Sequence, residues 1–132
     1  MAPEESRYPA DWLRIAERDL RRVRRLLDEH DPELAGFCLQ QAVEKSLKAF
    51  LLSRGWRLRR IHNPDALLDE AIVHDASLET FPSVCQKITA FYVVERYPLI
   101  IETGVTEEEV DSALEQVTEL IDRLQVKING TT

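Results

Sequence analysis

The chain has 132 residues, a net charge of −7 and two cysteines, which favours a single domain around one ordinary core. No run of about 18 apolar residues occurs, so we expect no membrane span, and the N-terminus lacks the basic and apolar regions of a secretory signal. A cytoplasmic location is therefore expected, with Cys38 and Cys85 as reduced, mostly buried thiols. A disulfide between these two cysteines is the open alternative.

Charge is unevenly distributed along the chain. Residues 1–60 carry 13 basic and 10 acidic side chains, whereas residues 61–132 carry 4 and 14. The overall acidity argues against general nucleic-acid binding, which favours strongly basic domains. The difference between the halves is typical of a chain that presents complementary surfaces to a partner.

Two long helices are predicted in the first half of the chain. The first spans about 8–30, because its apolar side chains recur every three or four residues. Asp31 and Pro32 are residues that cap and start a helix. The second helix then runs over about 32–54, and Gly55 is suited to the left-handed conformation at its end.

The second half predicts three more helices. Asn63 and Pro64 start a short one, and 74–83 is expected to be a loop or the frayed start of the next helix. That next helix covers about 82–96 and ends because Tyr97 precedes a proline.

A capping box of Thr106 and Glu109 begins the last helix, which runs to about Ile128. Four long amphipathic helices with short joints indicate an all-α fold, an antiparallel four-helix up-and-down bundle with a short additional helix. We expect one domain over 1–132, with its core at about 8–128.

The second helix carries a polar strip on the face opposite its main apolar stripe. Its members recur at helical spacing and share one azimuth: Gln41, Glu44, Lys45 and Lys48. Apolar side chains frame the strip: Leu34, Cys38 and Leu52. A polar strip inside an apolar frame is paired, wet or ligand-bound, which predicts a helix that is central or faces another chain. An ordinary solvated strip is the simpler alternative.

Motifs for several kinds of chemistry are missing from the sequence. The three histidines, His30, His62 and His74, have no partner at the spacing of a zinc motif. No nucleophile elbow and no glycine-rich phosphate loop occurs. We therefore predict no metal and no cofactor.

Arginines cluster in two places. The run over 18–25 alternates with acidic residues and predicts a solvated helix face. Arg57, Arg59 and Arg60 follow Trp56, and this cluster is the better nucleic-acid candidate because an aromatic ring among arginines can stack on a base.

Three segments together resemble the HEPN domain family: "QQAVEKSLKAFLLSRG" at 40–55, "HNPDALL" at 62–68 and "YVVERYP" at 92–98. The first is similar to the family signature "QA-x-EK-x-LKA", and the resemblance covers about residues 10–125. It implies a compact helical bundle that forms a homodimer and is often encoded beside a separate minimal nucleotidyltransferase.

The resemblance also implies two different activities. Some members are ribonuclease toxins of toxin–antitoxin pairs, with an R-x4-6-H motif near the end of a bundle helix. Arg96 matches the arginine of that motif, but no histidine follows His74, so the expected acid/base is missing. His62 could replace it only if it lay near Arg96. We therefore predict no catalytic residue, and Arg96 and His62 are weak candidates for that role.

The leading interpretation is a non-catalytic HEPN module that homodimerises, associates with a separate nucleotidyltransferase and holds a nucleotide or substrate in a groove. The candidate ligand- or anion-binding residues are Gln41, Glu44, Lys45, Lys48 and Arg96. Two alternatives stay open: an RNA-cleaving toxin with a degenerate motif, and a stand-alone dimeric interaction bundle. It also stays open whether RNA is a partner and whether the protein is an enzyme. The missing histidine favours a protein that is not an enzyme.

Overall fold

The computed structural model describes residues 6–57, 59–96 and 105–130, except for the side chains of 91–96. It contains the five expected helices: α1 (Pro9–Asp28), α2 (Pro32–Ser53), α3 (Pro64–His74), α4 (Pro82–Arg96) and α5 (Glu107–Asn129). A short 3-10 helix, η2 (Ala76–Thr80), joins α3 to α4. Within these ranges no residue is in a strand, and the all-α prediction is confirmed.

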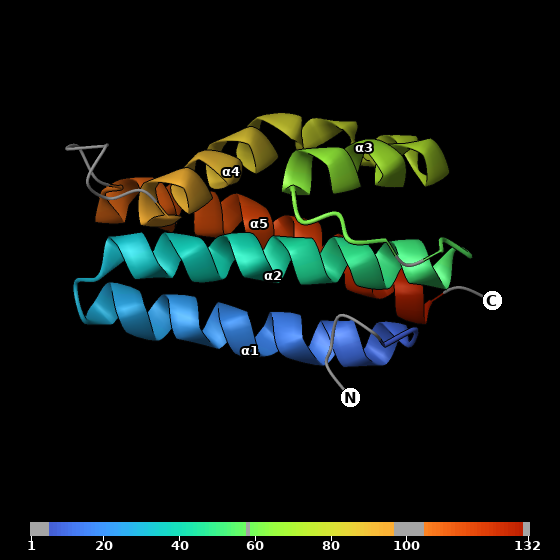
Figure 1. Cartoon of the computed structure of the whole chain (residues 1–132), viewed down its shortest axis with the longest axis horizontal. Coiled ribbons are helices and arrows are strands. Elements are labelled where there is room, and N and C mark those ends of the chain that lie inside the picture. Colours follow the sequence, from blue (N-terminus) through green and yellow to red (C-terminus); the bar gives the residue numbers. More distant parts are fainter. Residues whose placement is uncertain (1–5, 58, 97–104, 131–132) are drawn as a thin grey trace.

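The long helices run alternately up and down the bundle. Figure 1 shows α1, α2, α4 and α5 with opposite directions at each step along the chain, and α3 lies with η2 toward one end. This is the antiparallel four-helix arrangement with a short additional helix that the sequence predicts. No described helix is long and apolar enough to cross a membrane.

Local sequence sets the ends of the helices. The Asp31 side chain accepts a hydrogen bond from the Leu34 amide at 3.3 Å, and the Asn63 side chain accepts one from the Asp65 amide at 2.8 Å. Both cap a helix whose first residue is proline. Thr106 and Glu109 form the predicted reciprocal capping box. Gly55 has a φ of +86°, as expected for the left-handed end of α2.

Two local expectations differ from the structure. The first helix ends at Asp28, and His30 lies beyond it with a φ of 60°, because the chain must reverse toward the cap of α2. The segment expected to be a loop or the frayed start of the next helix contains the short 3-10 helix η2. The Asp75 side chain accepts a hydrogen bond from the Ser77 amide at 3.0 Å, and this local bond closes the first turn of η2.

Helix α2 is the central element of the bundle. It contacts α1, α3, α4 and α5, and its buried residues lie on nearly all sides. Leu39, Leu47 and Phe50 are fully buried in the main core, whereas Trp12 and Ala49 belong to a smaller cluster beside it. The central position predicted from the mixed face of this helix is confirmed.

Candidate ligand-binding site

A buried ionic network occupies the polar strip of α2. Glu44 Oε2 accepts hydrogen bonds from Lys45 Nζ at 3.2 Å and Lys48 Nζ at 3.0 Å. Glu44 and Lys48 are each 1% exposed, and Lys45 is 9% exposed. An ordinary solvated strip is excluded by this burial. The strip is paired, as a polar group inside an apolar frame requires.

Trp12 of α1 covers the two lysines. Its ring centroid lies 5.6 Å from Lys45 Nζ and 5.3 Å from Lys48 Nζ, distances at which a cation is attracted to the face of an indole. The indole Nε1 donates a hydrogen bond to the Ser6 carbonyl at 2.9 Å. The start of the described chain is thereby fixed against α1 beside the network.

The connector between α2 and α3 closes the network from the other side. His62 Nδ1 lies 2.9 Å from Glu44 Oε2 and 3.3 Å from Lys48 Nζ. The Gln40 side chain donates a hydrogen bond to the His62 carbonyl at 3.2 Å, which fixes the backbone of the connector. The His62 side chain is 57% exposed, so its ring joins the buried carboxylate of Glu44 to the surface.

Two adjoining pockets open beside the network. A pocket of about 440 Å³ is lined by residues of α2, α3, α4 and the connector, among them Gln40, His62 and Thr89. A second pocket of about 260 Å³ lies between α1 and α2 and is lined by Arg18, Asp19 and Arg22, among others. Three residues of α2 line both pockets: Phe37, Gln41 and Lys45.

The structure therefore brings most of the predicted site residues together. Gln41, Glu44 and Lys45 line a pocket, and Lys48 is held behind them on Glu44. Arg96 is the last residue of α4, but its side chain lies outside the described residues, so its place in the site stays a prediction.

Sequence reasoning missed the contribution of α1. Asp19 is 5% exposed, and its Oδ1 accepts a hydrogen bond from Arg22 Nη1 at 3.4 Å. Burial raises the pKa of Asp19, although the charges of Arg18, Arg22 and Lys45 act in the opposite direction. The sequence predicts a solvated face for the arginine run over 18–25, and only the packing of α1 on α2 shows that Arg18 and Arg22 border a pocket.

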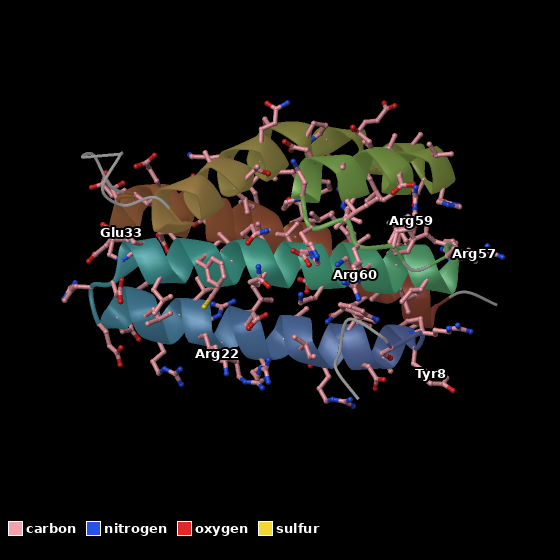
Figure 2. All side chains as sticks on the ribbon, viewed as in Figure 1. Tyr8, Arg22, Glu33, Arg57, Arg59 and Arg60 are labelled. Carbon is pink, nitrogen blue, oxygen red and sulfur yellow. The ribbon has the colours of Figure 1, made fainter. Side chains whose placement is uncertain are left out.

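The arginines of the connector are less available than the sequence suggests. Arg59 lies over the Trp56 ring, with its guanidinium carbon 5.5 Å from the centroid, and is paired with Glu70. The Trp56 indole also donates to Glu70, at 3.4 Å. Figure 2 shows Arg57, Arg59 and Arg60 toward one end of the face and Arg22 toward the other. Trp56 is thus already stacked, which weakens the case for base stacking there.

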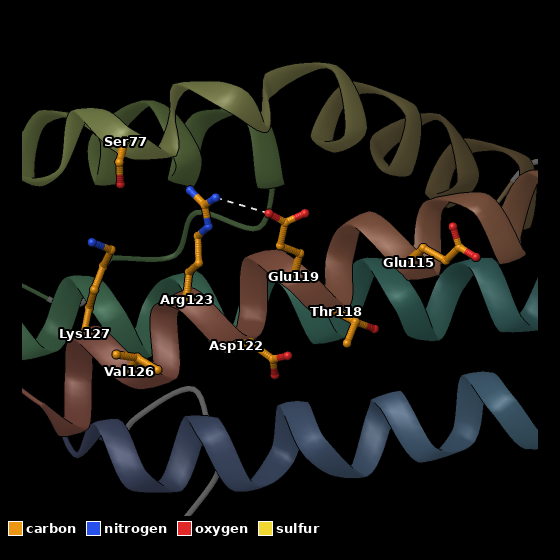
Figure 3. Close-up of a pocket in the computed structure, with 8 residues that line it drawn as sticks. All are labelled: Ser77, Glu115, Thr118, Glu119, Asp122, Arg123, Val126 and Lys127. Carbon is orange, nitrogen blue, oxygen red and sulfur yellow. Dashed lines mark hydrogen bonds and ion pairs between the residues drawn. The ribbon is translucent and has the colours of Figure 1, made fainter.

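A larger pocket lies elsewhere, along α5. It measures about 660 Å³ and is lined mainly by α5, with Ser77 of η2 at its edge. Figure 3 shows Arg123 and Lys127 extending from α5 toward the segment that carries Ser77. Arg123 donates to Glu119 at 3.1 Å, and Lys127 pairs with Asp75. Both cations of this pocket are therefore already paired with carboxylates.

The remaining titratable groups give no further site. Cys38 and Cys85 are both buried, and no disulfide joins them. Burial, with a smaller effect from Asp65 and Asp69, raises the pKa of Cys85 to about 12. Among the described residues, no three His, Cys, Asp or Glu side chains are grouped so as to hold a metal ion.

Comparison with known proteins agrees with this fold and with the segments that carry the resemblance. The family model described as "HEPN domain" matches residues 9–127. The chain therefore belongs to the HEPN domain family. No curated protein gave a significant match.

Two solved structures are similar to the chain over most of its length. The crystal structure of TT1696 from Thermus thermophilus has a TM-score of 0.80 and 27% identity, covering 90% of this chain and 97% of that one. The crystal structure of ST0689, described as an archaeal HEPN homologue, has a TM-score of 0.74 and 25% identity, covering 92% and 98%. The bundle is thus the fold of the family.

Proposed function

We propose that this protein is a non-catalytic HEPN module that forms a homodimer, associates with a separate minimal nucleotidyltransferase and binds a nucleotide or nucleotide-bearing substrate in the groove beside α2. The observation that carries this proposal is the network of Glu44, Lys45 and Lys48, which is buried and yet borders a pocket of about 440 Å³. Pockets of a few hundred cubic ångströms are the usual size for small ligands.

Stability alone is a poor reason to keep such a network. Removing charged groups from water costs several kcal/mol per ion, and well-packed apolar residues are often as stable as a buried ion pair. Glu44 binds both lysines of the network, and Lys45 lines both pockets, which places a positive charge at the pocket wall. An anionic ligand would pair with this positive charge, and a polar network beside a pocket is a common form of binding site.

The non-catalytic part of the proposal rests on the sequence after Arg96. No histidine follows His74, so the acid/base expected from the family's ribonuclease motif is missing. The partner and the dimer are supported by the unequal charge of the two halves of the chain, because oppositely charged surfaces favour association and set its orientation.

Sedimentation of the purified protein tests the dimer and the partner. We expect a dimer at micromolar concentration, and a larger complex when a candidate minimal nucleotidyltransferase is added. A protein that stays monomeric and does not bind the added enzyme would contradict this part of the proposal.

A titration with nucleoside monophosphates tests the groove. Lys45→Gln should weaken binding about tenfold, because Lys45 is the lysine that lines both pockets. Lys87→Gln, an exposed lysine on α4, is the matched control and should leave the affinity unchanged. Circular dichroism checks that both variants keep the bundle.

A second candidate function is cleavage of RNA, and one contact favours it. The buried carboxylate of Glu44 holds His62 Nδ1 at 2.9 Å, while the ring is more than half exposed. A carboxylate that orients an exposed imidazole is the arrangement of a general acid/base. We expect no cleavage of a fluorescent RNA by the pure dimer. Cleavage that is abolished both in His62→Ala and in Arg96→Ala would replace the first proposal with this one.

A further inference from the structure

The pocket between α1 and α2 has a composition unlike the rest of this acidic chain. Among the described residues that line it, Arg18 and Arg22 from α1 and Lys45 from α2 are cationic, and Asp19 is the one carboxylate. The protein as a whole has a net charge of −7. An anion entering this pocket therefore meets a local excess of positive charge.

The donors of this pocket are only partly used within the protein. A guanidinium has five N–H groups and an ammonium has three. The hydrogen bond from Arg22 to Asp19 is long, at 3.4 Å, and Lys45 gives one hydrogen bond to Glu44. Several N–H groups on both side chains remain for a ligand. Gln41, which also lines the pocket, adds an amide.

The adjoining larger pocket has a different character. It presents the ring of Phe37, the amide of Asn63 and the hydroxyl of Thr89. Aromatic and amide groups suit a flat heterocycle with hydrogen-bonding edges, whereas arginine and lysine suit an oxyanion. Phe37, Gln41 and Lys45 form the boundary shared by the two pockets, so one ligand can occupy both.

We propose that the pocket between α1 and α2 is a phosphate subsite, in which Arg22 and Lys45 bind the terminal phosphate of a nucleotide whose nucleoside lies in the adjoining pocket. This inference rests on the proposed function, because it assigns the orientation of a ligand in the same groove. Arg18 lies at the exposed rim and adds positive charge.

Asp19 has a defined role in this arrangement. It is the carboxylate that the phosphate displaces from Arg22, and its own charge opposes binding of an anion. A ligand without a phosphate leaves the contact of Arg22 with Asp19 intact. The subsite therefore separates nucleotides from nucleosides, and the substitution Asp19→Asn strengthens binding of the phosphate.

Equilibrium titration of the purified dimer tests the assignment with paired probes. The probes are AMP and adenosine, the corresponding pairs of the other three bases, and a short single-stranded RNA. For at least one base, we expect the monophosphate to bind the wild type at least tenfold more tightly than its nucleoside. Arg22→Ala should abolish this difference, and Asp19→Asn should increase it severalfold. Arg24→Ala, an exposed arginine of the same helix, is the matched control for the lost charge and should leave the difference unchanged.

Each other outcome overturns the proposal at a defined point. Equal affinity for nucleotide and nucleoside, or a nucleotide affinity that Arg22→Ala leaves unchanged, would refute the phosphate subsite while the groove remains a nucleotide site. Tight binding of the RNA alone, dependent on Arg22, would assign the pocket to a backbone phosphate and refute the terminal one. Failure of every probe to bind would refute both the subsite and the role of the groove. The dimer and its partner are measured separately by sedimentation.

Discussion

The two pocketed faces of this bundle use charged residues in opposite ways. Along α5, a pocket of about 660 Å³ is lined by two cations that each have a carboxylate partner, in one exposed pair and one partly exposed pair. Beside α2, one smaller pocket is lined by the buried Glu44, which binds two lysines, and the other is lined by Arg18 and Arg22. Both cations of the larger pocket are thus paired, whereas the described lining of the pocket between α1 and α2 has three cations and one carboxylate.

The difference shows why size is a poor guide to a binding site here. Exposed pairs such as Arg123 with Glu119 are solvated in any case and contribute little. A buried group such as Glu44 needs every one of its partners. Charge that is costly to bury and is still present beside an opening is therefore the better indication of function.

The largest expected effect comes from removing the carboxylate at the centre of the network. Glu44→Gln should lower the free energy of unfolding by about 3–5 kcal/mol, because it removes a buried carboxylate that contacts both Lys45 and Lys48. Glu119→Gln, the corresponding change in the α5 pocket, should cost no more than about 0.5 kcal/mol. Urea unfolding at pH 7 measures both.

A companion variant keeps this prediction testable if Glu44→Gln does not fold. Glu44→Gln with Lys48→Met removes both charges and should recover most of the lost stability, since an apolar side chain of similar volume can replace a buried ion. A Glu44→Gln protein as stable as the wild type would show that the network is solvated, and the contrast between the two faces would disappear.

A smaller effect is expected in the coupling between partners. A double-mutant cycle on Glu44 and Lys48 should give a coupling energy of about 1–3 kcal/mol, the range for contacting residues in one network. The same cycle on Glu119 and Arg123 should give about 0.3–0.5 kcal/mol, as for exposed helix pairs. Arg123 also lies over the Phe81 ring, 5.4 Å from its centroid, so a single substitution of Arg123 removes this contact as well as the ion pair. Only the cycle separates the energy of the ion pair from that of the ring contact. Equal couplings would contradict the comparison.

The sequence predicts the helices well because their ends are determined locally. Proline after an Asp or Asn cap, and the reciprocal pair of Thr106 with Glu109, fix a start within a residue or so whatever the rest of the chain does. The segment after α3 is harder. The bond from the Ser77 amide to Asp75 that begins η2 uses residues that are equally common in irregular turns.

The candidate site was only half predictable, for a physical reason. Spacing along one helix places Gln41, Glu44 and Lys45 on one face without any knowledge of the tertiary structure. Spacing does not show that the Trp12 ring covers the lysines or that Arg22 faces the same pocket, because those contacts depend on how α1 rotates against α2. His62 was a candidate for another reason, its supposed nearness to Arg96, whereas the contact that the structure gives it is with Glu44.

The smallest expected effect is the pH dependence of the α5 face. A hydrogen bond from Lys127, with a further one from Ser77, lowers the pKa of Asp75 from 3.8 to about 2. A carboxylate with a lowered pKa in the folded state stabilises the fold above its unfolded value, and the contribution is lost as the pH falls from about 4 to about 2. Because the pair is partly exposed, we expect this contribution to stay below about 1 kcal/mol.

Unfolding of wild type and Asp75→Asn from pH 7 to pH 2 should show a stability difference that shrinks as the pH falls from about 4 to about 2. Lys127→Gln should reduce the pH dependence in the same range, because the lysine is its main cause. A larger loss, comparable to that of Glu44→Gln, would place a critical charge on the α5 face and reverse the ranking of the two faces.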